Sequence, residues 1–493
     1  MFESAEIGHK IGKEEYARQE PQLRQELLAA QYELLKCEKF PVVVLINGVD
    51  GAGKGETVNL FNEWMDPRHI HTHAFGPLTD EERDRPEMWR FWRALPPKGR
   101  IGILFGSWYT DPILQRIMGK DKRAAFEHRL ERIRHFERML VAEGTLVLKL
   151  WFHLSKKAQA KRLKKLSENK KTAWRITPAD WERFKHYDEF VELSAHTLRE
   201  TSTGEAPWHV IEGANAQYRS LTAGRLLLDS LRQRLEGKSA VVTPAAPPPA
   251  PPIDGRNLLA AMDYSATLSP EAYDERMLKA QAKLNALTRS KHMPRHSLIL
   301  VFEGMDAAGK GSTIRRITRA MDARFYHVVP IAAPSDEERA QPYLWRFWRR
   351  LPRRNHCAIF DRSWYGRVLV ERVEGFCPES DWMRAYHEIN EFEEQLAEAG
   401  CIVAKFWLAV TPDEQLRRFK ERENTPYKRF KITDEDWRNR DKWPQYERAV
   451  CDMVDRTSTD TAPWKLVAAN DKLHARVDVI ERLIELIRGV VKT

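Results

Sequence analysis

A glycine-rich segment that contains one lysine occurs twice in the chain, and its residue types suit the binding of phosphate. The first copy, Gly48 to Gly55, reads Gly-Val-Asp-Gly-Ala-Gly-Lys-Gly, and the second, Gly304 to Gly311, reads Gly-Met-Asp-Ala-Ala-Gly-Lys-Gly. Glycines let consecutive backbone N–H groups turn toward one anion, and a helix after the loop adds the positive end of its dipole. From the second copy we predict phosphate contacts by Gly304, Ala307, Ala308, Gly309, Lys310, Gly311 and Ser312.

Each loop also carries an aspartate, which is an unexpected residue in a site for anions. Asp50 lies in the first copy and Asp306 in the second, and the serine or threonine that usually follows the lysine is replaced by Gly55 and Gly311. A carboxylate repels phosphate unless a cation lies between them, so we predict that Asp306 helps to hold Mg²⁺, directly or through water. The alternative is that Asp306 points away and caps the following helix.

Further charged residues follow an apolar run in the second half. Asp361 and Arg362 come directly after residues 357–360, and a carboxylate at the end of a strand beside the phosphate loop suits Mg²⁺. Downstream lie Arg367, Glu371 and Arg372. Arginines at this spacing suit the clamping of phosphoryl groups, and we assign Arg367 to phosphate binding. For Arg372, a salt bridge at the surface is an equally good interpretation.

The first half lacks most of this second group. At the same offset of 256 residues, Phe105 stands in place of Asp361, Gly106 in place of Arg362, Asp111 in place of Arg367 and Gln115 in place of Glu371. Phosphoryl transfer depends on positioning and charge neutralisation, so these losses predict that the first copy is catalytically impaired. It would serve as a structural partner or an auxiliary surface for polyanions. What it retains is a degenerate loop with Asp50, Gly53 and Lys54.

The loops need a scaffold, and the apolar runs indicate which one. Strands are predicted at 42–46, 101–105 and 146–152 in the first half and at 298–302, 357–360 and 402–408 in the second. Trp382, Tyr386, Ile389, Phe392 and Leu396 recur at helical spacing between the last two runs. Buried strands separated by helices indicate a parallel sheet with helices on both faces, which is an α/β fold.

The two halves repeat one another in a constant register. Trp89-Arg-Phe-Trp-Arg93 recurs as Trp345-Arg-Phe-Trp-Arg349, 256 residues later, as the glycine loops do. A period this long indicates duplicated domains and not a solenoid. We predict a domain at 1–237, a linker at 238–256 and a domain at 257–493. The linker has six prolines between 243 and 252, which favours a semi-rigid polyproline II spacer over a docking site for a partner.

Composition narrows the class of protein. Lys plus Arg is 81 and Asp plus Glu is 71, for a net charge of +10, which suggests a polyanionic partner such as nucleic acid, an acidic membrane or polyphosphate. Five cysteines without metal-ligand spacing fit a reducing cytoplasm better than a disulfide framework or a zinc site. No apolar run approaches the roughly 20 residues of a membrane span, and no secretory signal is visible.

Together the motifs resemble the type 2 polyphosphate kinase family. The likeness rests on the loop Gly-x-Asp-x-x-Gly-Lys-Gly, the Trp-Arg-Phe-Trp block before Leu351-Pro352, Asp-Arg-Ser-Trp-Tyr from Asp361, Lys405-Phe-Trp-Leu, and the late Thr-Ser-Thr and Ala-Pro-Trp. A tandem chain with a degenerate first copy looks like the two-domain polyphosphate:AMP phosphotransferases of that family. The resemblance implies two tandem P-loop kinase domains similar to thymidylate kinase, with Mg²⁺ as cofactor and inorganic polyphosphate as phosphoryl donor.

The resemblance also implies the roles of single residues. Catalytic roles carry over to the matching positions Asp306, Lys310, Asp361, Arg362 and Glu371. Of these, Asp306, Asp361 and Glu371 would place Mg²⁺ between donor and acceptor phosphates. The acceptor AMP is already anionic, so its phosphate oxygen needs no general base. We expect polyphosphate and AMP or ADP as partners, neither nucleic acid nor a membrane, and we leave a homo-oligomer open.

Three other functions fit parts of the sequence. The acceptor could be ADP, so that the product is ATP, or the donor could be ATP, as in an ordinary nucleoside monophosphate kinase. A non-enzymatic binder of nucleic acid or another polyanion, with relic loops, is a further alternative. The intact pair Asp361-Arg362 argues against this last function.

Overall fold

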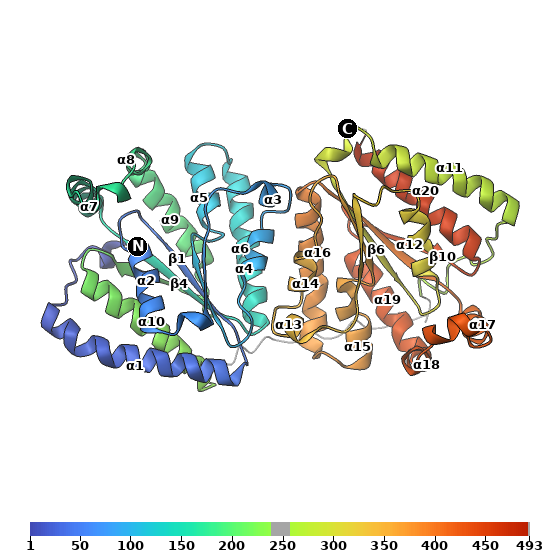
Figure 1. Ribbon diagram of the computed structural model, residues 1–493, viewed down its shortest axis with the longest axis horizontal. Helices are drawn as coiled ribbons and strands as arrows, with labels where there is room; N and C mark the ends of the chain where they lie inside the picture. Colours follow the sequence, from blue (N-terminus) through green and yellow to red (C-terminus); the bar gives the residue numbers. More distant parts are fainter. Residues whose placement is uncertain (238–256, 492–493) are drawn as a thin grey trace. The chain divides into compact units, whose positions relative to one another are not determined.

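The chain folds into two compact units. The computed structural model describes residues 1–237 and 257–491 (Figure 1). Of these, the first unit takes 1–77, 90–237 and 334–345, and the second takes 78–89, 257–333 and 346–491. The predicted linker at 238–256 lies outside the described residues, so the predicted domain limits remain a prediction.

Each half of the chain alternates strands with helices. The strands of the first half are β1 (Val42–Gly48), β2 (Ile70–Ala74), β3 (Ile101–Phe105), β4 (Leu146–His153) and β5 (Trp208–Glu212). Its helices are α1 (Lys13–Cys37), α2 (Lys54–Trp64), α3 (Asp80–Arg83), α4 (Trp89–Ala94), α5 (Thr110–Ile117), α6 (Arg123–Ala142), α7 (Lys156–Glu168), α8 (Pro178–Lys185), α9 (Tyr187–Thr201) and α10 (Ala216–Leu235).

The second half repeats this order. Its strands are β6 (Ser297–Gly304), β7 (Tyr326–Pro330), β8 (Cys357–Asp361), β9 (Cys401–Ala409) and β10 (Trp464–Ala468). Its helices are α11 (Pro270–Thr288), α12 (Lys310–Thr318), α13 (Asp336–Arg339), α14 (Trp345–Trp348), α15 (Val370–Glu374), α16 (Glu379–Glu398), α17 (Pro412–Glu423), α18 (Asp434–Asp441), α19 (Trp443–Thr457) and α20 (Lys472–Val491).

Both sheets are parallel and have five strands. The order is β2-β3-β1-β4-β5 in the first unit and β10-β9-β6-β8-β7 in the second, so the strand before each glycine loop is central. The α/β prediction is confirmed, and so are the six predicted strands. The edge strands were missed because they carry little apolar pattern: in β2 only the first residue is buried.

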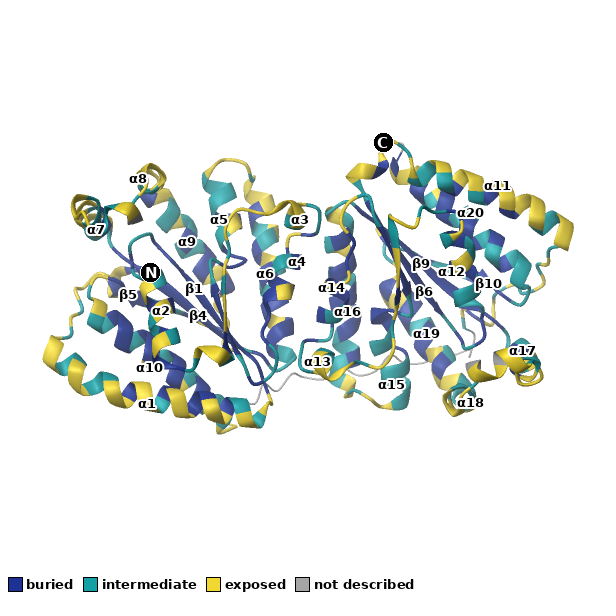
Figure 2. Cartoon of the chain, in the orientation of Figure 1, coloured by how far each residue is buried: buried dark blue, intermediate teal, exposed yellow. Residues whose placement is uncertain are grey.

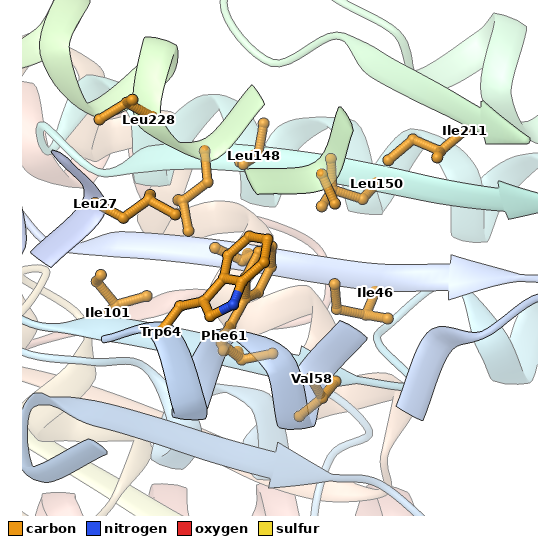
Figure 3. Packing of buried hydrophobic residues seen from close by; sticks show 14 of the residues in the cluster. Leu27, Ile46, Val58, Phe61, Trp64, Ile101, Leu148, Leu150, Ile211 and Leu228 are labelled. Carbon is orange, nitrogen blue, oxygen red and sulfur yellow. The ribbon is translucent and has the colours of Figure 1, made fainter. Parts of the chain in front are cut away.

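The core of the first unit explains why its strands are almost wholly apolar. Residues 42–46 of β1 are fully buried because helices cover both faces of the sheet. Figure 3 shows Phe61 and Trp64 of α2 in one cluster with Leu27 of α1 and Leu228 of α10, packed over strand residues such as Ile46. Removing such side chains from water is the main stabilising contribution, at about 25 cal/mol per Å² of apolar surface.

The second unit is built in the same way. The predicted helix around Trp382 is α16, and its five predicted apolar residues are all buried. In Figure 2 the strands β6 and β9 are dark blue, while outer helices such as α11 expose yellow faces. No helix among the described residues is long and apolar enough to cross a membrane.

A buried ion pair fixes the segment that follows β8. Lys405 Nζ lies 2.7 Å from Glu393 Oε2 and donates to the hydroxyl of Tyr365 at 2.8 Å. Glu393 Oε1 also accepts from Trp364 Nε1 at 3.0 Å and from Tyr365 at 2.7 Å. The first unit has the equivalent cluster, in which Lys149 lies 2.7 Å from a glutamate. Because both units keep it, the Ser-Trp-Tyr motif belongs to the shared scaffold.

Candidate active site

The second glycine loop connects β6 to α12 in a geometry that few sequences allow. Gly304 has φ of +152°, and a Cβ there would lie 2.6 Å from the carbonyl oxygen of Leu408. Helix α12 begins at Lys310, so its first N–H groups face the loop. The Lys310 ammonium donates to the Gly304 carbonyl at 2.6 Å. Burial lowers the pKa of Lys310, and the nearby charge of Arg362 lowers it further. Both effects are expected for a buried cation that lies close to another cation.

The loop aspartate is held by two side chains from other elements. Asp306 Oδ1 accepts from Arg362 at 3.0 Å, and Asp306 Oδ2 accepts from Asn439 Nδ2 at 2.9 Å. Arg362 has φ of +63°, in the left-handed region that an arginine rarely adopts. Such strain concentrates at functional sites. It places the guanidinium directly after β8, beside the loop.

Two of the predicted carboxylates and two of the predicted cations, Asp306, Asp361, Lys310 and Arg362, meet in one cavity of about 530 Å³. Asp361 ends β8, and its Oδ2 would lie 3.9 Å from a Cβ added to Gly311, so the absent side chain at 311 leaves room beside this carboxylate. The predicted residues that line the cavity are Asp306, Ala307, Ala308, Gly309, Lys310, Gly311, Ser312, Asp361 and Arg362. Carboxylate oxygens are the ligands that Mg²⁺ prefers, so Asp306 and Asp361 fit a magnesium site.

The cavity carries more cations than the sequence motifs indicated. The additional basic residues that line it are Arg315, Arg418, Arg422, Lys472 and Arg476. Arg418 is 2% exposed and donates to the carbonyls of Ala307 and Ala308 at 2.9 and 3.0 Å. A buried guanidinium therefore fixes the loop backbone from α17. In the sequence, residues 417–422 read Arg-Arg-Phe-Lys-Glu-Arg, a basic run that fits either an exposed helix face or a lid over the phosphates.

Glu303 is a buried acid that the sequence motifs did not reveal. It lies just before Gly304 and accepts from the hydroxyl of Ser363 at 2.8 Å. Burial raises its pKa, while the nearby Lys310 opposes the shift. The first unit has Asn47 at this position, which accepts from Ser107 at 2.8 Å. A comparison of the two halves at the constant offset of 256 residues shows this difference between an acid and an amide. That difference could have identified Glu303 as a candidate from the sequence.

Three predicted residues do not line this cavity: Gly304, Arg367 and Glu371. The Nε of Arg367 is 3.0 Å from Glu371 Oε2, and its Nη1 donates to Asp381 at 3.3 Å. Neither Arg367 nor Glu371 lines the cavity that contains Lys310, so their roles remain predictions. Arg372 lies 2.7 Å from Asp452 and 4.3 Å from the ring of Trp382, in a salt bridge that is mostly buried and not at the surface.

The loop of the first unit has a different set of partners. Lys54 donates to the Gly48 carbonyl at 2.5 Å and lies 3.3 Å from Asp50. Asp50 also accepts from Arg183 Nε at 2.8 Å. Burial alone would raise the pKa of Asp50, but Lys54 and Arg183 together lower it. Thus Asp50 is neutralised by cations of the protein itself.

The parallel sheet, the central glycine loop and the carboxylate at the end of the neighbouring strand define a P-loop phosphotransferase of the nucleotide-kinase type. The model of the family Polyphosphate kinase 2 (PPK2) matches residues 10–239 and 267–492, and the chain belongs to this family. The resemblance stated from the sequence is therefore confirmed.

Relatives of similar length support the assignment. The chain is 55% identical over 493 residues to a polyphosphate:AMP phosphotransferase of Pseudomonas aeruginosa, covering 100% of this chain and 99% of that protein. It is 38% identical over 480 residues to a polyphosphate:AMP phosphotransferase of Acinetobacter johnsonii, covering 95% and 96%. A crystal structure of a polyphosphate kinase 2 from Pseudomonas aeruginosa matches with a TM-score of 0.91, 54% identity and full coverage of both chains.

Proposed function

We propose that this protein transfers the terminal phosphoryl group of inorganic polyphosphate to AMP, giving ADP, and that the second unit performs the transfer. The observation that carries the proposal is the single cavity in which Asp306, Lys310, Asp361 and Arg362 meet. Relatives that match almost the whole chain are named polyphosphate:AMP phosphotransferases. The first unit has no acid or arginine at the positions of Asp361 and Arg362.

The chemistry requires two polyanions to approach in line. Two unit charges about 4 Å apart repel by about 4 kcal/mol at an effective dielectric constant of 20, and phosphates carry more charge than that. The AMP phosphate is already an anionic nucleophile, so the protein needs no base to activate it. The task of the site is to orient the two phosphates and to offset their repulsion.

The residues of the cavity divide this task. The loop N–H groups, Lys310 and Arg362 hold the terminal phosphates of the donor, and Arg315, Lys472 and Arg476 extend the positive lining along the cavity. Asp306 and Asp361 would hold Mg²⁺, which supplies further charge neutralisation between donor and acceptor. Asn439 and Arg362 fix the orientation of Asp306. Glu371 stays a proposed ligand, because its carboxylate lies beside Arg367.

A purified-enzyme assay tests the donor and the acceptor together. Polyphosphate and Mg²⁺ are incubated with AMP or with ADP, and ATP replaces polyphosphate in a parallel reaction. We expect ADP from AMP plus polyphosphate, little product with ATP as donor, and loss of activity with a chelator of divalent metals. Product from ATP alone would instead identify an ordinary nucleotide kinase.

The second candidate acceptor is ADP. A relative from Rhizobium meliloti, named ADP-polyphosphate phosphotransferase 3, is 37% identical over 228 residues, covering 46% of this chain and 80% of that protein. Faster formation of ATP from ADP than of ADP from AMP would favour this acceptor.

We also propose that the enzyme works in the cytoplasm. All five cysteines are free, and Cys357 and Cys401 are buried, which fits a reducing compartment. That the protein binds neither nucleic acid nor membranes remains a prediction. Whether it forms a homo-oligomer stays open.

A further inference from the structure

The first unit contains a cavity of about 1140 Å³ at the position that corresponds to the active cavity of the second. It is bounded by four residues of the glycine loop (Gly48, Val49, Asp50 and Lys54), by the end of β3 and by helices α5, α8 and α9. This volume slightly exceeds the range of about 300–1,000 Å³ that is usual for small-molecule sites in proteins. The loss of catalytic residues has therefore not filled the site with side chains.

The walls of this cavity are apolar where the second unit is charged. Among the lining residues are Phe105, Ile113, Ile117, Met118 and Phe190. In the second unit, Asp361 stands at the position that corresponds to Phe105, and Glu374 stands at the position that corresponds to Met118. Glu374 lies 2.9 Å from Lys442 and 3.2 Å from Arg438. A charged network has thus been replaced by apolar surface that faces an open space.

The charges that remain in this cavity balance one another. Its lining has two acids, Asp50 and Glu182, and two permanent cations, Lys54 and Arg183. Both cations are engaged with Asp50, Lys54 at 3.3 Å and Arg183 at 2.8 Å. The cavity of the second unit is lined by seven Lys and Arg residues against four acids. The first cavity therefore lacks the excess of positive charge that a polyanion requires.

Two buried polar atoms in the lining have no hydrogen-bond partner among the described residues. They are Gln159 Oε1 and Trp151 Nε1, in side chains that are 5% and 1% exposed. The equivalent glutamine of the second unit, Gln415, has its Oε1 satisfied by Arg440 at 3.1 Å; the first unit has Phe184 at that position. A buried acceptor without a donor costs about 1–3 kcal/mol, and a ligand N–H would remove that cost.

We propose that this cavity is a binding site for a small planar aromatic molecule that carries an N–H donor and at most one negative charge, and that it does not take polyphosphate. The apolar walls would cover the ring system, and Gln159 would accept the N–H. The single anionic group would lie toward Lys54 and the first turn of α2. This inference concerns the first unit alone and does not depend on the reaction proposed for the second.

The test uses 8-anilinonaphthalene-1-sulfonate as the probe, because it combines an aromatic body, one N–H and one sulfonate. The full chain is titrated by fluorescence, and the stoichiometry is measured by calorimetry. We expect saturable binding of one molecule per chain that tripolyphosphate does not displace. Absence of a saturable site, or displacement by tripolyphosphate, would overturn the proposal.

Matched variants locate the site. Ile117→Glu and Met118→Glu should weaken probe binding at least about tenfold, since each puts a charge against the ring. Val373→Glu, at the position that matches Ile117 in the second unit, should leave probe binding unchanged. Gln159→Leu should weaken it about fivefold, the effect of one hydrogen bond.

Two control measurements distinguish a loss of probe binding from a loss of folding. The thermal melting temperature and the transfer activity of the second unit check that each variant is folded. Met118 is 60% exposed, so its substitution should not disturb the core. Unchanged probe binding in both glutamate variants, or equal loss in Val373→Glu, would contradict the proposal.

Discussion

The same loop aspartate meets different partners in the two units, and this difference distinguishes the proposed active site from its counterpart in the first unit. Asp306 is held by Arg362 and by the neutral amide of Asn439, with Asp361 in the same cavity. Asp50 is held by Lys54 and by Arg183, which occupies the position of Asn439. Compared with the second unit, the first unit lacks the cation Arg362, which follows β8, and has an additional cation, Arg183, on α8. The carboxylate of Asp50 is thus neutralised by two fixed side chains of the protein.

The comparison also shows that scaffold and chemistry can be separated. Both units keep the buried lysine–glutamate pair that fixes the Ser-Trp-Tyr segment. Gly106 has φ of +69° and Arg362 has φ of +63°, so the backbone after the strand is the same. The side chains expected to contact phosphate or metal differ: Asp361 and Arg362 of the second unit correspond to Phe105 and Gly106 of the first. The shared fold therefore does not depend on the residues that we propose for catalysis.

The largest effect is expected from the carboxylate that the first unit lacks. Asp361→Asn keeps the shape of the side chain but removes a negative charge that fits Mg²⁺, and the transfer rate should fall about 100- to 1,000-fold. Initial rates with polyphosphate and AMP measure this. The control is Asp50→Asn, which should retain the rate within about twofold; an equal loss in both variants would contradict the division between the units.

An intermediate effect is expected from giving the second unit the partner found in the first. Asn439→Arg would place a fixed cation on Asp306, in competition with the metal. We expect a rate about tenfold lower and a higher Mg²⁺ concentration for half-maximal rate. The reverse change, Arg183→Asn, should leave the rate unaltered. A normal Mg²⁺ dependence in Asn439→Arg would show that Asp306 does not bind the metal.

The smallest effect concerns stability. Burial raises the pKa of Glu303 above its ordinary 4.5, so above pH 4.5 the unfolded chain loses this proton more readily than the folded chain. The free energy of unfolding therefore falls as the pH rises from 4.5 to the pKa of the folded state, by about 1.4 kcal/mol per pH unit. Glu303→Gln removes this loss and should be more stable than the parent at pH 7, but not at pH 4. Asn47→Gln is a control without a charge change. Thermal unfolding at the two pH values checks the sign, and an equal gain at both would contradict it.

Much of the fold could be predicted because its signals are local. Parallel strands buried on both faces give apolar runs, and the glycine loops and the constant register of the repeat mark the strand that each loop follows. The edge strand β2 escaped prediction because its side chains are mostly exposed.

The candidate site was predictable only in part. Asp306, Lys310, Asp361 and Arg362 belong to motifs and lie together. Glu303 was missed, and Arg418 was visible only as part of a basic run, because the roles of both residues arise from burial against the loop. Glu371 and Arg367 follow closely in sequence, but Glu371, on α15, pairs with Arg367 just before that helix, and neither lines the cavity. Short spacing along the chain could not reveal that direction.

The most direct test of the account compares the two loop lysines. Initial rates of polyphosphate-dependent ADP formation are measured side by side for Lys310→Ala and Lys54→Ala, with melting temperatures to confirm folding. The account predicts that Lys310→Ala loses at least about 100-fold, while Lys54→Ala stays within a few-fold of the parent. A greater loss in Lys54→Ala would place the chemistry in the first unit and contradict the central claim.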